Sequence, residues 1–431
     1  MALELLDLIE VALPKWYVSM ATSVLPSALP DWLTKLLTAE AVEHVPAAFD
    51  KALQAVYEKE EAFIPPRLLV EMDAIAAGFC DGLRRKAPKA VAEKCDVGEA
   101  AAAVRRVNMI PELVRMTCTM FGAWGGASAS GNLLQLRALD FGSGPLANFT
   151  TLSVHRPPPP AAGPSAPAAG PSGAAAAGTA TTPPAPSASS SSFLLSEEKE
   201  DALPGVGDAA GNLPFAFASL AFPGLVGVVT GTSEKGIGLS EKVWEVYNTT
   251  TGVQPGHYDG EADVLVMRDV LELAPNRSVA EAYMRSDPDR TWAVFLGVGD
   301  YATQTMDIVG YRESDLHAYT PETMPAVTGQ QAFEELVYVD KHPQPSAGSN
   351  LPDLLADYYG SLDFNTTRHV NAEHETGDLH IAVYDYSASA PKMMLSVGRV
   401  DEAGDYGNAN EWKACFRPYL EYTLADLWGG L

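Results

Sequence analysis

The sequence predicts an α+β protein in which a helical N-terminal segment precedes a four-layer αββα body. Two observations support this class. Before about residue 116, apolar residues recur at helical spacing. After that point, short apolar runs of strand length alternate with helical patterns, which is typical of sheets covered by helices. We therefore expect residues 1–117 to form the helical segment and residues 118–431 to form the layered body.

Individual elements follow from apolar spacing and from the turn-forming residues between them. Helical periodicity covers residues 4–18, 32–42, 48–60, 67–83, 278–285 and 351–359. Strand-like runs cover residues 133–141, 225–230, 262–268, 291–298, 379–385 and 392–397. Residues 157–192 are almost entirely Pro, Ala, Gly and Ser, so they cannot bury enough apolar surface to offset the entropy of ordering. We expect this segment to be a disordered insertion in a surface loop.

The composition argues against several classes of function. Acidic residues outnumber basic residues by 55 to 29, and the formal net charge is −26. Such a surface repels phosphate backbones and anionic membranes, so we expect no nucleic-acid partner. The sequence holds no run of about twenty apolar residues, and we therefore expect no transmembrane span.

The cysteines and sequons bear on the compartment. Four cysteines are too few for a disulfide-dense scaffold, but one or two disulfides are open to the chain, and Cys80 and Cys95 are the nearest pair. The apolar N-terminus carries three acidic residues and no basic leader, so it resembles an amphipathic helix. Sequons favour a secretory route, at Asn148, Asn248, Asn276 and Asn365. We predict a lysosomal, vacuolar or secreted protein, with a cytoplasmic location as the alternative.

Several catalytic signatures are absent from the sequence. It has no Gly-rich dinucleotide loop, no nucleotide-phosphate loop, no GxSxG elbow and no HExxH helix. The histidines His369, His374 and His380 lie close together in the sequence, but their spacing matches no standard zinc motif. We therefore predict no metal site and no cofactor.

The most informative stretch is residues 116–124, MTCTMFGAW, between the helical block and the first pair of strands. A turn and a strand follow it, and that strand ends in Arg137-Ala138-Leu139-Asp140. Taken alone, Cys118 reads as a small buried apolar residue, which is the usual fate of a free cysteine. The flanking motifs favour a catalytic role instead.

This arrangement resembles the cysteine branch of the N-terminal-nucleophile hydrolases, in which a Cys-[ST] start, a hairpin and an Arg-x-Leu-Asp strand follow one another. Penicillin acyltransferases, acid ceramidase, N-acylethanolamine acid amidase and bile-salt hydrolases share this pattern. Further motifs follow in the family order: PPRLLVEMDAIAAG at 65–78, FPGLVG at 222–227, SEKGIGLSE at 233–241, TGDLHIAVYD at 376–385 and RPY at 417–419. Ala74 stands where the family has Gly. The match covers most of residues 65–430, apart from the Pro/Ala-rich insertion.

The resemblance implies that the chain breaks itself between Thr117 and Cys118 and that the two products stay associated. The break would create an α-amino group on the nucleophile's own residue, and a pKa of about 7.7–8 suits that group to proton exchange with the thiol. A separate histidine base is then unnecessary. Arg137 would stabilise thiolate or acyl-oxygen charge, since a guanidinium stays protonated. Asp140 would hold the α-ammonium group.

The spacing of Arg137 and Asp140 raises a geometric question. The two residues are three positions apart, so an ideal strand places their side chains on opposite faces. Both reach one site only if the strand ends or bulges near Leu139.

Weaker candidates lie further along the chain. Glu241 ends the SEKGIGLSE motif and Arg417 begins the last motif, so both are candidates for stabilising substrate or transition state, although Glu241 could equally be a solvent-facing charge. Members of the family use an Asn as an oxyanion-hole donor at the end of a mid-chain strand. The equivalent segment 337–342 holds no Asn, and Asp340 or Lys341 stands in its place. An ionised Asp would repel an oxyanion.

We therefore expect a self-processing cysteine amidohydrolase or acyltransferase that forms a thioester on Cys118. The expected substrate is a small linear N-acyl amide or lipid, such as a ceramide, an N-acylethanolamine or a penicillin-like compound. One alternative is a catalytically inactive binding or structural member of the same fold. The other is an acyl-ester lipase of the phospholipase B-like group, and the Arg137–Asp140 motif favours the amidase over it.

Overall fold

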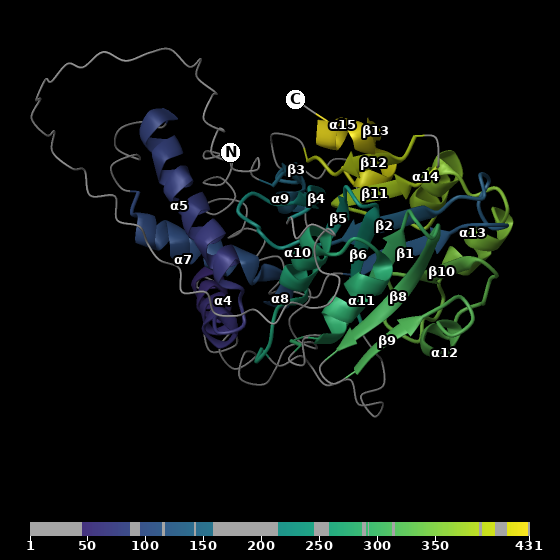
Figure 1. Ribbon diagram of the computed structural model, residues 1–431, viewed down its shortest axis with the longest axis horizontal. Coiled ribbons are helices and arrows are strands. Elements are labelled where there is room, and N and C mark those ends of the chain that lie inside the picture. The colour runs from purple at the N-terminus through teal and green to yellow at the C-terminus, as the bar shows by residue number, and fades with distance from the viewer. Residues whose placement is uncertain are drawn as a thin grey trace, which may run out of the picture.

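Two antiparallel sheets form the centre of the computed structural model (Figure 1). The structure describes residues 45–86, 95–113, 117–141, 144–157, 214–244, 258–286, 290–291, 293–312, 315–387, 390–400 and 412–429. The helices expected over 4–18 and 32–42 lie outside these residues. The insertion expected over 157–192 also lies outside them, apart from Pro157.

The first sheet has six strands in the order β10-β1-β2-β11-β12-β13, and every neighbouring pair is antiparallel. Its bounds are β1 (Thr117–Ala123), β2 (Leu134–Asp140), β10 (Leu336–Val339), β11 (His380–Asp385), β12 (Lys392–Val397) and β13 (Leu420–Thr423). The hairpin β1–β2 lies near the middle, and all of β2 is buried. A strand covered on both faces reads as a nearly continuous apolar run, and this explains why residues 133–141 could be recognised in the sequence.

The second sheet has seven strands that follow one another in chain order. They are β3 (Thr151–His155), β4 (Phe217–Ala221), β5 (Thr230–Ser233), β6 (Ile237–Val243), β7 (Val294–Asp300), β8 (Thr305–Arg312) and β9 (Asp315–Tyr319). The segment 225–230 was expected to be a strand, but only its last residue belongs to β5. The expectation was wrong because a turn at Pro223-Gly224 and bends at Gly227 and Val229 shape this stretch, and the Val228 amide donates to the Val264 carbonyl oxygen instead of to a neighbouring strand.

The two sheets pack face to face. Met120 and Tyr384 of the first sheet share a core with Phe295 and Met306 of the second. Glycine permits a close approach here, because a Cβ on Gly297 would lie 2.4 Å from the terminal carbon of Met306 and 2.9 Å from the sulfur of Met120.

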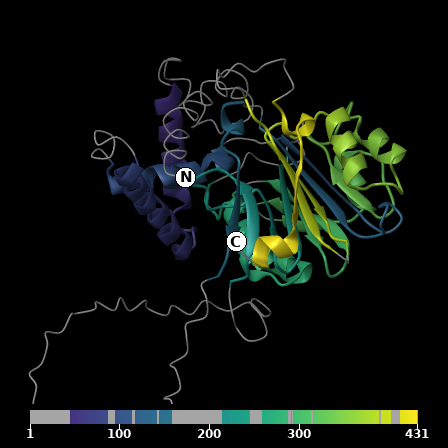
Figure 2. The same ribbon diagram turned by 90° about the horizontal axis from the view of Figure 1, so that it is seen from above.

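Helices cover both outer faces of this pair of sheets (Figure 2). On the first sheet, α13 (Leu351–Asp357) and α14 (Phe364–Glu373) pack against the outward side chains of β1, β2 and β11. On the second sheet, α10 (Asp263–Leu273) and α11 (Arg277–Ser286) pack against β5, β6 and β7. The expected four-layer αββα arrangement is therefore confirmed. The shorter elements are α9 (Gly144–Ala147), α12 (Pro325–Thr328), the 3-10 helix η4 (Ala414–Phe416) and α15 (Leu424–Gly429).

Helix α10 corrects one expectation, because residues 262–268 were predicted to be a strand. The run from Val264 to Met267 is apolar at every position, and the polar residues Arg268, Asp269 and Glu272 that mark one face of the helix come only after it. A short apolar run of this kind cannot be assigned to strand or helix by periodicity alone.

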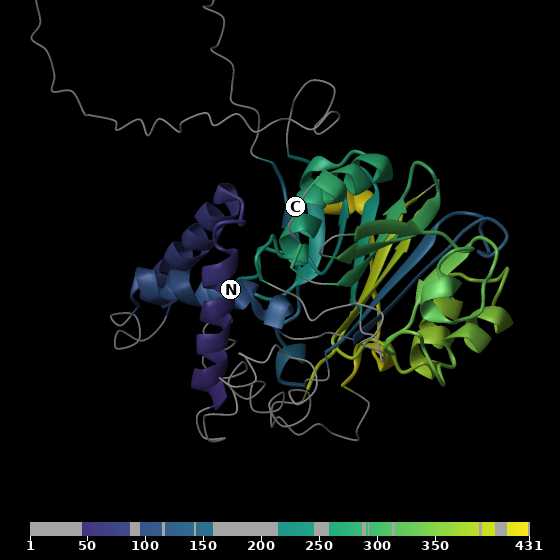
Figure 3. The ribbon, with the colours of Figure 1, turned by 90° about the horizontal axis from the view of Figure 1, so that it is seen from below.

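The described residues before Thr117 form helices that lie beside the sheets (Figure 3). They are α4 (Val45–Glu60), α5 (Pro66–Lys86), α7 (Val97–Asn108) and α8 (Ile110–Leu113). A disulfide joins Cys80 of α5 to Cys95, two residues before α7. None of the described helices is both long enough and apolar enough to cross a membrane.

Ion pairs and buried carboxyls link these helices to α10 of the body. Arg67 pairs with Asp269, and Glu71 pairs with Arg268 at 3.1 Å. Deeper in the same interface lie the carboxyls of Glu60, Glu112 and Asp263, from α4, α8 and α10. Burial is the largest cause that raises the pKa of each, and it raises the pKa of Glu60 and Glu112 well above the usual value. Protonated carboxyls avoid the cost of burying like charges side by side.

These pKa shifts predict that the fold is more stable in acid. Above the unfolded pKa of about 4.5, the unfolded chain has released protons that the folded chain still binds, so the free energy of unfolding falls as pH rises. Glu112→Gln should remove one such group and flatten the slope by up to about 1.4 kcal/mol per pH unit. Urea unfolding between pH 4.5 and 7.5 measures this slope. The exposed Glu58 provides the control Glu58→Gln, and an unchanged slope in Glu112→Gln would contradict the assignment.

Candidate active site

The candidate nucleophile lies in a row of side chains that crosses the first sheet. Cys118 of β1 is opposite Leu139 of β2, and Leu139 is opposite His380 of β11. Directly opposed residues in antiparallel strands point to the same face. His380 Nε2 lies 2.9 Å from the hydroxyl of Thr230 in the second sheet, so this is the face between the two sheets. The Cys118 side chain is fully buried there.

Arg137 lies two residues before Leu139 on β2, so its side chain points into the same layer between the sheets. Its neighbours across the strands are Met120 and Ala382. One guanidinium nitrogen lies 3.3 Å from a carboxylate oxygen of Glu241, and Nε donates to the Val229 carbonyl oxygen at 3.4 Å. The Arg137 and Glu241 side chains are exposed by 0% and 1%. The structure therefore brings Cys118, Arg137 and Glu241 together, and it excludes the solvent-facing alternative for Glu241.

Burial favours the protonated form of the Cys118 thiol. Burial raises the pKa of the Cys118 thiol far above its usual value, and the charges of Glu241 and Asp140 add to this. Arg137 and Lys242 act in the opposite direction but do not outweigh burial. A thiol becomes a strong nucleophile only as the thiolate, so this cysteine needs a base or a change in solvation before it can react.

Asp140 lies on the other face of the sheet. The β1–β2 register runs without interruption from Ala123↔Leu134 to Thr117↔Asp140, so no bulge brings Asp140 round to the side of Arg137. The prediction from their spacing is confirmed. Asp140 instead accepts hydrogen bonds from the Thr376 hydroxyl at 2.6 Å and the Gly377 amide at 2.7 Å. Burial raises the pKa of Asp140 in spite of these donors.

The position of Asp140 is nevertheless informative. Asp140 is the direct partner of Thr117 in the pairing of β1 with β2. The Thr117 hydroxyl donates to the Asp140 backbone carbonyl oxygen at 3.4 Å. The peptide bond between Thr117 and Cys118 therefore runs antiparallel to the Leu139–Asp140 peptide, with Arg137 on one face of the sheet and Asp140 on the other.

Asp340 does not suit the role of an oxyanion donor. Asp340 directly follows β10, in which Val337 and Val339 face the second sheet and Tyr338 faces outward. The charge of Asp340 lies close to Tyr338, because it adds to the effect of burial in raising the pKa of the Tyr338 hydroxyl. Burial alone would raise the pKa of Asp340, but hydrogen bonds from Ser346, Ser349 and His342 outweigh burial and lower it. A carboxylate kept ionised has no proton to donate. Asp340 therefore organises the loop after β10.

The other candidates do not join the group around Cys118. The described contacts of Arg417 are with Ala414 and, through charge, with Arg399. Lys341 donates to the carbonyl oxygens of His374 and Glu375 at 2.9 and 2.8 Å. Its charge also lowers the pKa of Asp140, so Lys341 lies on the Asp140 side.

His380 is a neighbour that the sequence did not reveal. Burial, and then the charge of Arg137, lowers the pKa of His380 well below its usual value, so the ring is neutral. Its Nδ1 has no hydrogen-bond partner among the described residues. Only the pairing of β2 with β11 places it in the row with Cys118, and no local motif carries that information.

The sequence is similar to two proteins of Dictyostelium discoideum. The chain is 27% identical over 401 residues to Protein dcd1A of Dictyostelium discoideum, covering 90% of this chain and 72% of that protein. It is 28% identical over 365 residues to Protein dcd1B of the same organism, covering 83% of this chain and 56% of that protein. The chain thus spans little more than half the length of the second relative. No protein-family model matches it.

Two solved structures resemble the fold. One is the Caenorhabditis elegans ortholog of N-acylethanolamine-hydrolyzing acid amidase, with 11% identity, a TM-score of 0.38, and coverage of 63% of this chain and 94% of that chain. The other is penicillin V acylase from Agrobacterium tumefaciens, with 11% identity, a TM-score of 0.35, and coverage of 72% and 88%. The architecture described above rests on strand pairing and packing, independently of these scores.

Proposed function

We propose that this chain is a self-processing cysteine amidohydrolase or acyltransferase with Cys118 as its nucleophile. The observation that carries the proposal is the placement of Cys118 at the start of a central strand, beside the fully buried pair Arg137 and Glu241. A buried guanidinium in a dry layer is a strong stabiliser of developing negative charge. The ordered motifs on both sides of this site support the same reading.

Processing would begin with attack of the Cys118 sulfur on the carbonyl carbon of Thr117. The C–N bond breaks, the thiol proton passes to the departing amine of Cys118, and Thr117 becomes a thioester. Water then hydrolyses the thioester and leaves Thr117 with a free carboxylate. Asp140 is the direct strand partner of Thr117 and would hold the new α-ammonium group.

The mature reaction would use the same groups. The α-amine of Cys118 takes the thiol proton, the sulfur attacks the acyl carbon of the substrate, and the leaving amine receives the proton. Arg137 stabilises the oxyanion. Water or another amine then accepts the acyl group from the thioester. We propose a linear fatty-acyl or aryl-acyl amide as substrate, because an amide needs this kind of activation.

The inactive member of the fold is the second candidate function. It is favoured by one observation, which is that Asp340 is an ionised loop organiser at the place where the family has an oxyanion donor. An enzyme of this type needs that donor from another residue. The two candidates differ in whether the chain cleaves itself.

Cleavage is tested by a denaturing gel of the purified chain. We expect two fragments, residues 1–117 and 118–431, with Cys118 at the new N-terminus by sequencing. Cys118→Ala should stay intact and inactive, because it has no sulfur to attack the Thr117 carbonyl. Cys415 is the other free cysteine among the described residues, and Cys415→Ala should cleave normally. An intact wild-type chain at every pH from 4 to 8 would favour the inactive member.

Arg137 is tested by turnover of a panel of N-acyl amides and esters. Arg137→Gln should lower kcat by about 10²–10³-fold, because one preorganised donor to the oxyanion is lost. Arg84→Gln is the matched control, since Arg84 is half-exposed and pairs only with Asp81 of its own helix among the described contacts. Equal rates for the two variants would remove Arg137 from the mechanism, and no turnover of any amide would reject the substrate class.

We also propose that the protein passes through the secretory route to an acidic compartment. The Cys80–Cys95 disulfide fits an oxidising environment, and the buried carboxyls with raised pKa fit an acidic one. Asn365 lies in α14 and is exposed. Protein from its native source should carry a glycan at Asn365 or at Asn248, measured as a peptide mass shift on deglycosylation. Unmodified asparagines at both positions would argue for the cytoplasm.

A further inference from the structure

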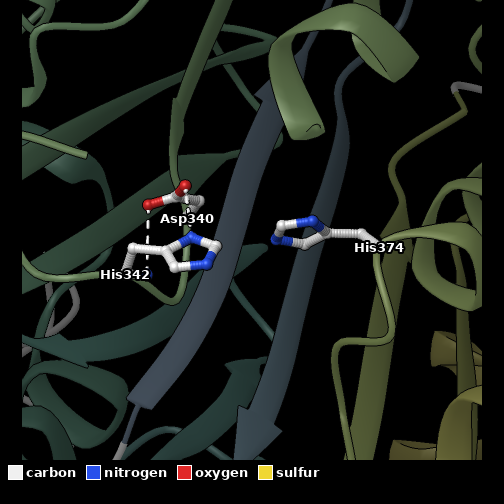
Figure 4. Close-up of side chains that lie close together, drawn as sticks. All are labelled: Asp340, His342 and His374. Atoms are coloured by element: carbon white, nitrogen blue, oxygen red, sulfur yellow. Dashed lines mark hydrogen bonds and ion pairs between the residues drawn. The ribbon is translucent and has the colours of Figure 1, made fainter. Parts of the chain in front are cut away.

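A second group of side chains lies next to the end of β10, at one edge of the first sheet and separate from Cys118. Asp340 and His342 follow β10, and His374 follows α14 (Figure 4). Each offers one ligand atom, and these atoms all lie within 4.8 Å of one another. We propose that Asp340, His342 and His374 form a binding site for a borderline divalent transition metal such as Zn²⁺. The proposal rests on none of the chemistry at Cys118.

Hydrogen bonds determine which nitrogen of His374 is available. Its Nδ1 lies 2.6 Å from Oδ1 of Asn350, and Nδ2 of the same amide donates to the Glu373 carbonyl oxygen at 3.0 Å. The Asn350 oxygen must therefore accept, so Nδ1 of His374 carries the proton and Nε2 carries the lone pair. That Nε2 is buried and has no hydrogen-bond partner among the described residues. An orphaned buried nitrogen of this kind points to a missing ligand.

His342 has the same arrangement. Its Nδ1 lies 2.9 Å from Oδ2 of Asp340. The same carboxyl also accepts from the His342 backbone amide and from the Ser346 hydroxyl, so it acts here as an acceptor. The proton is again on Nδ1, which leaves the lone pair on Nε2. A histidine that donates its other ring nitrogen to a carboxylate or carbonyl is the usual arrangement around a bound metal.

The distance between the rings fits a shared ion. The ring centroids of His342 and His374 are 6.0 Å apart, and the rings are inclined by 62°. Two imidazoles that bind one zinc at about 2.1 Å through nitrogen place their centroids about 5 to 6 Å apart. Figure 4 shows the rings of His342 and His374 turned toward each other, with Asp340 next to His342.

The local charges are compatible with this ion. Asp340 contributes a negative charge, either as a direct ligand or through Nδ1 of His342. The nearby cation is Lys341, whose ammonium group donates to the carbonyl oxygens of His374 and Glu375 and points at the loop backbone. Two imidazoles with one carboxylate select Zn²⁺, Co²⁺ or Ni²⁺ over the oxygen-preferring Mg²⁺ and Ca²⁺.

Metal binding is tested on the full chain, purified without a histidine tag and treated with a chelator. Titration with Co²⁺, followed by its visible absorption and by calorimetry, should give about one ion per chain that Zn²⁺ displaces and Mg²⁺ does not. Saturating Zn²⁺ should raise Tm by about 2 to 4 °C. His342→Ala should weaken binding by more than about tenfold and abolish the Tm shift.

Control variants separate a built site from surface binding. His342 is only partly buried, so His342→Ala has little effect on folding, whereas His374→Gln tests the buried ligand. His369 is an exposed histidine of the same α14, and His369→Ala should bind Co²⁺ like the wild type. The absence of one-to-one binding, or equal binding by His342→Ala and His369→Ala, would overturn the proposal in favour of adventitious surface binding only.

Discussion

The guanidinium of Arg137, buried between two sheets, is the constraint on which the candidate site depends. Guanidinium groups carry a permanent positive charge in proteins, so a dry layer tolerates one only with an acidic or carbonyl partner on the facing sheet. Glu241 and the Val229 carbonyl supply these partners, and both belong to the second sheet or the loop that leads into it. The contact therefore fixes how the two sheets align, and it does so at the row that contains Cys118. Burial raises the pKa of Glu241 to about 8, so this partner of Arg137 changes its protonation state close to neutral pH.

Local sequence was enough to predict the parts of the fold that local forces determine. The helices near 48–60 and 67–83, and the strands near 133–141, 379–385 and 392–397, all appear close to their expected bounds. The layered class followed from the alternation of these elements. Helix α10 was missed because its first half is an unbroken apolar run and its polar residues begin only at Arg268. Strand β4 was missed because its five small and apolar residues, all buried, carry only a weak signal.

The site was predictable only in part, for a similar reason. Cys118, Arg137 and Glu241 lie in recognisable motifs, and the structure gathers them. The opposite orientation of Asp140 followed from strand geometry, although its partners Thr376 and Gly377 come from the far end of the chain. His380 enters through strand pairing, and His342 meets His374 because the segments that follow β10 and α14 contact each other. Contacts of this kind depend on tertiary arrangement, so no spacing rule along the sequence detects them. The five hydrogen bonds that Asp340 accepts are likewise a tertiary feature.

The Cys80–Cys95 disulfide has a consequence for how a processed molecule would hold together. Both sulfurs lie on the N-terminal side of Thr117, so this bond closes a loop within one fragment and tethers nothing across the cut. A cleaved molecule would be a noncovalent heterodimer, joined through the described residues by packing and by the charged contacts of Arg67 and Glu71 with α10. Its smaller subunit would then be exchangeable. Reducing agents would leave the assembly intact, whereas high ionic strength would loosen it by screening those pairs.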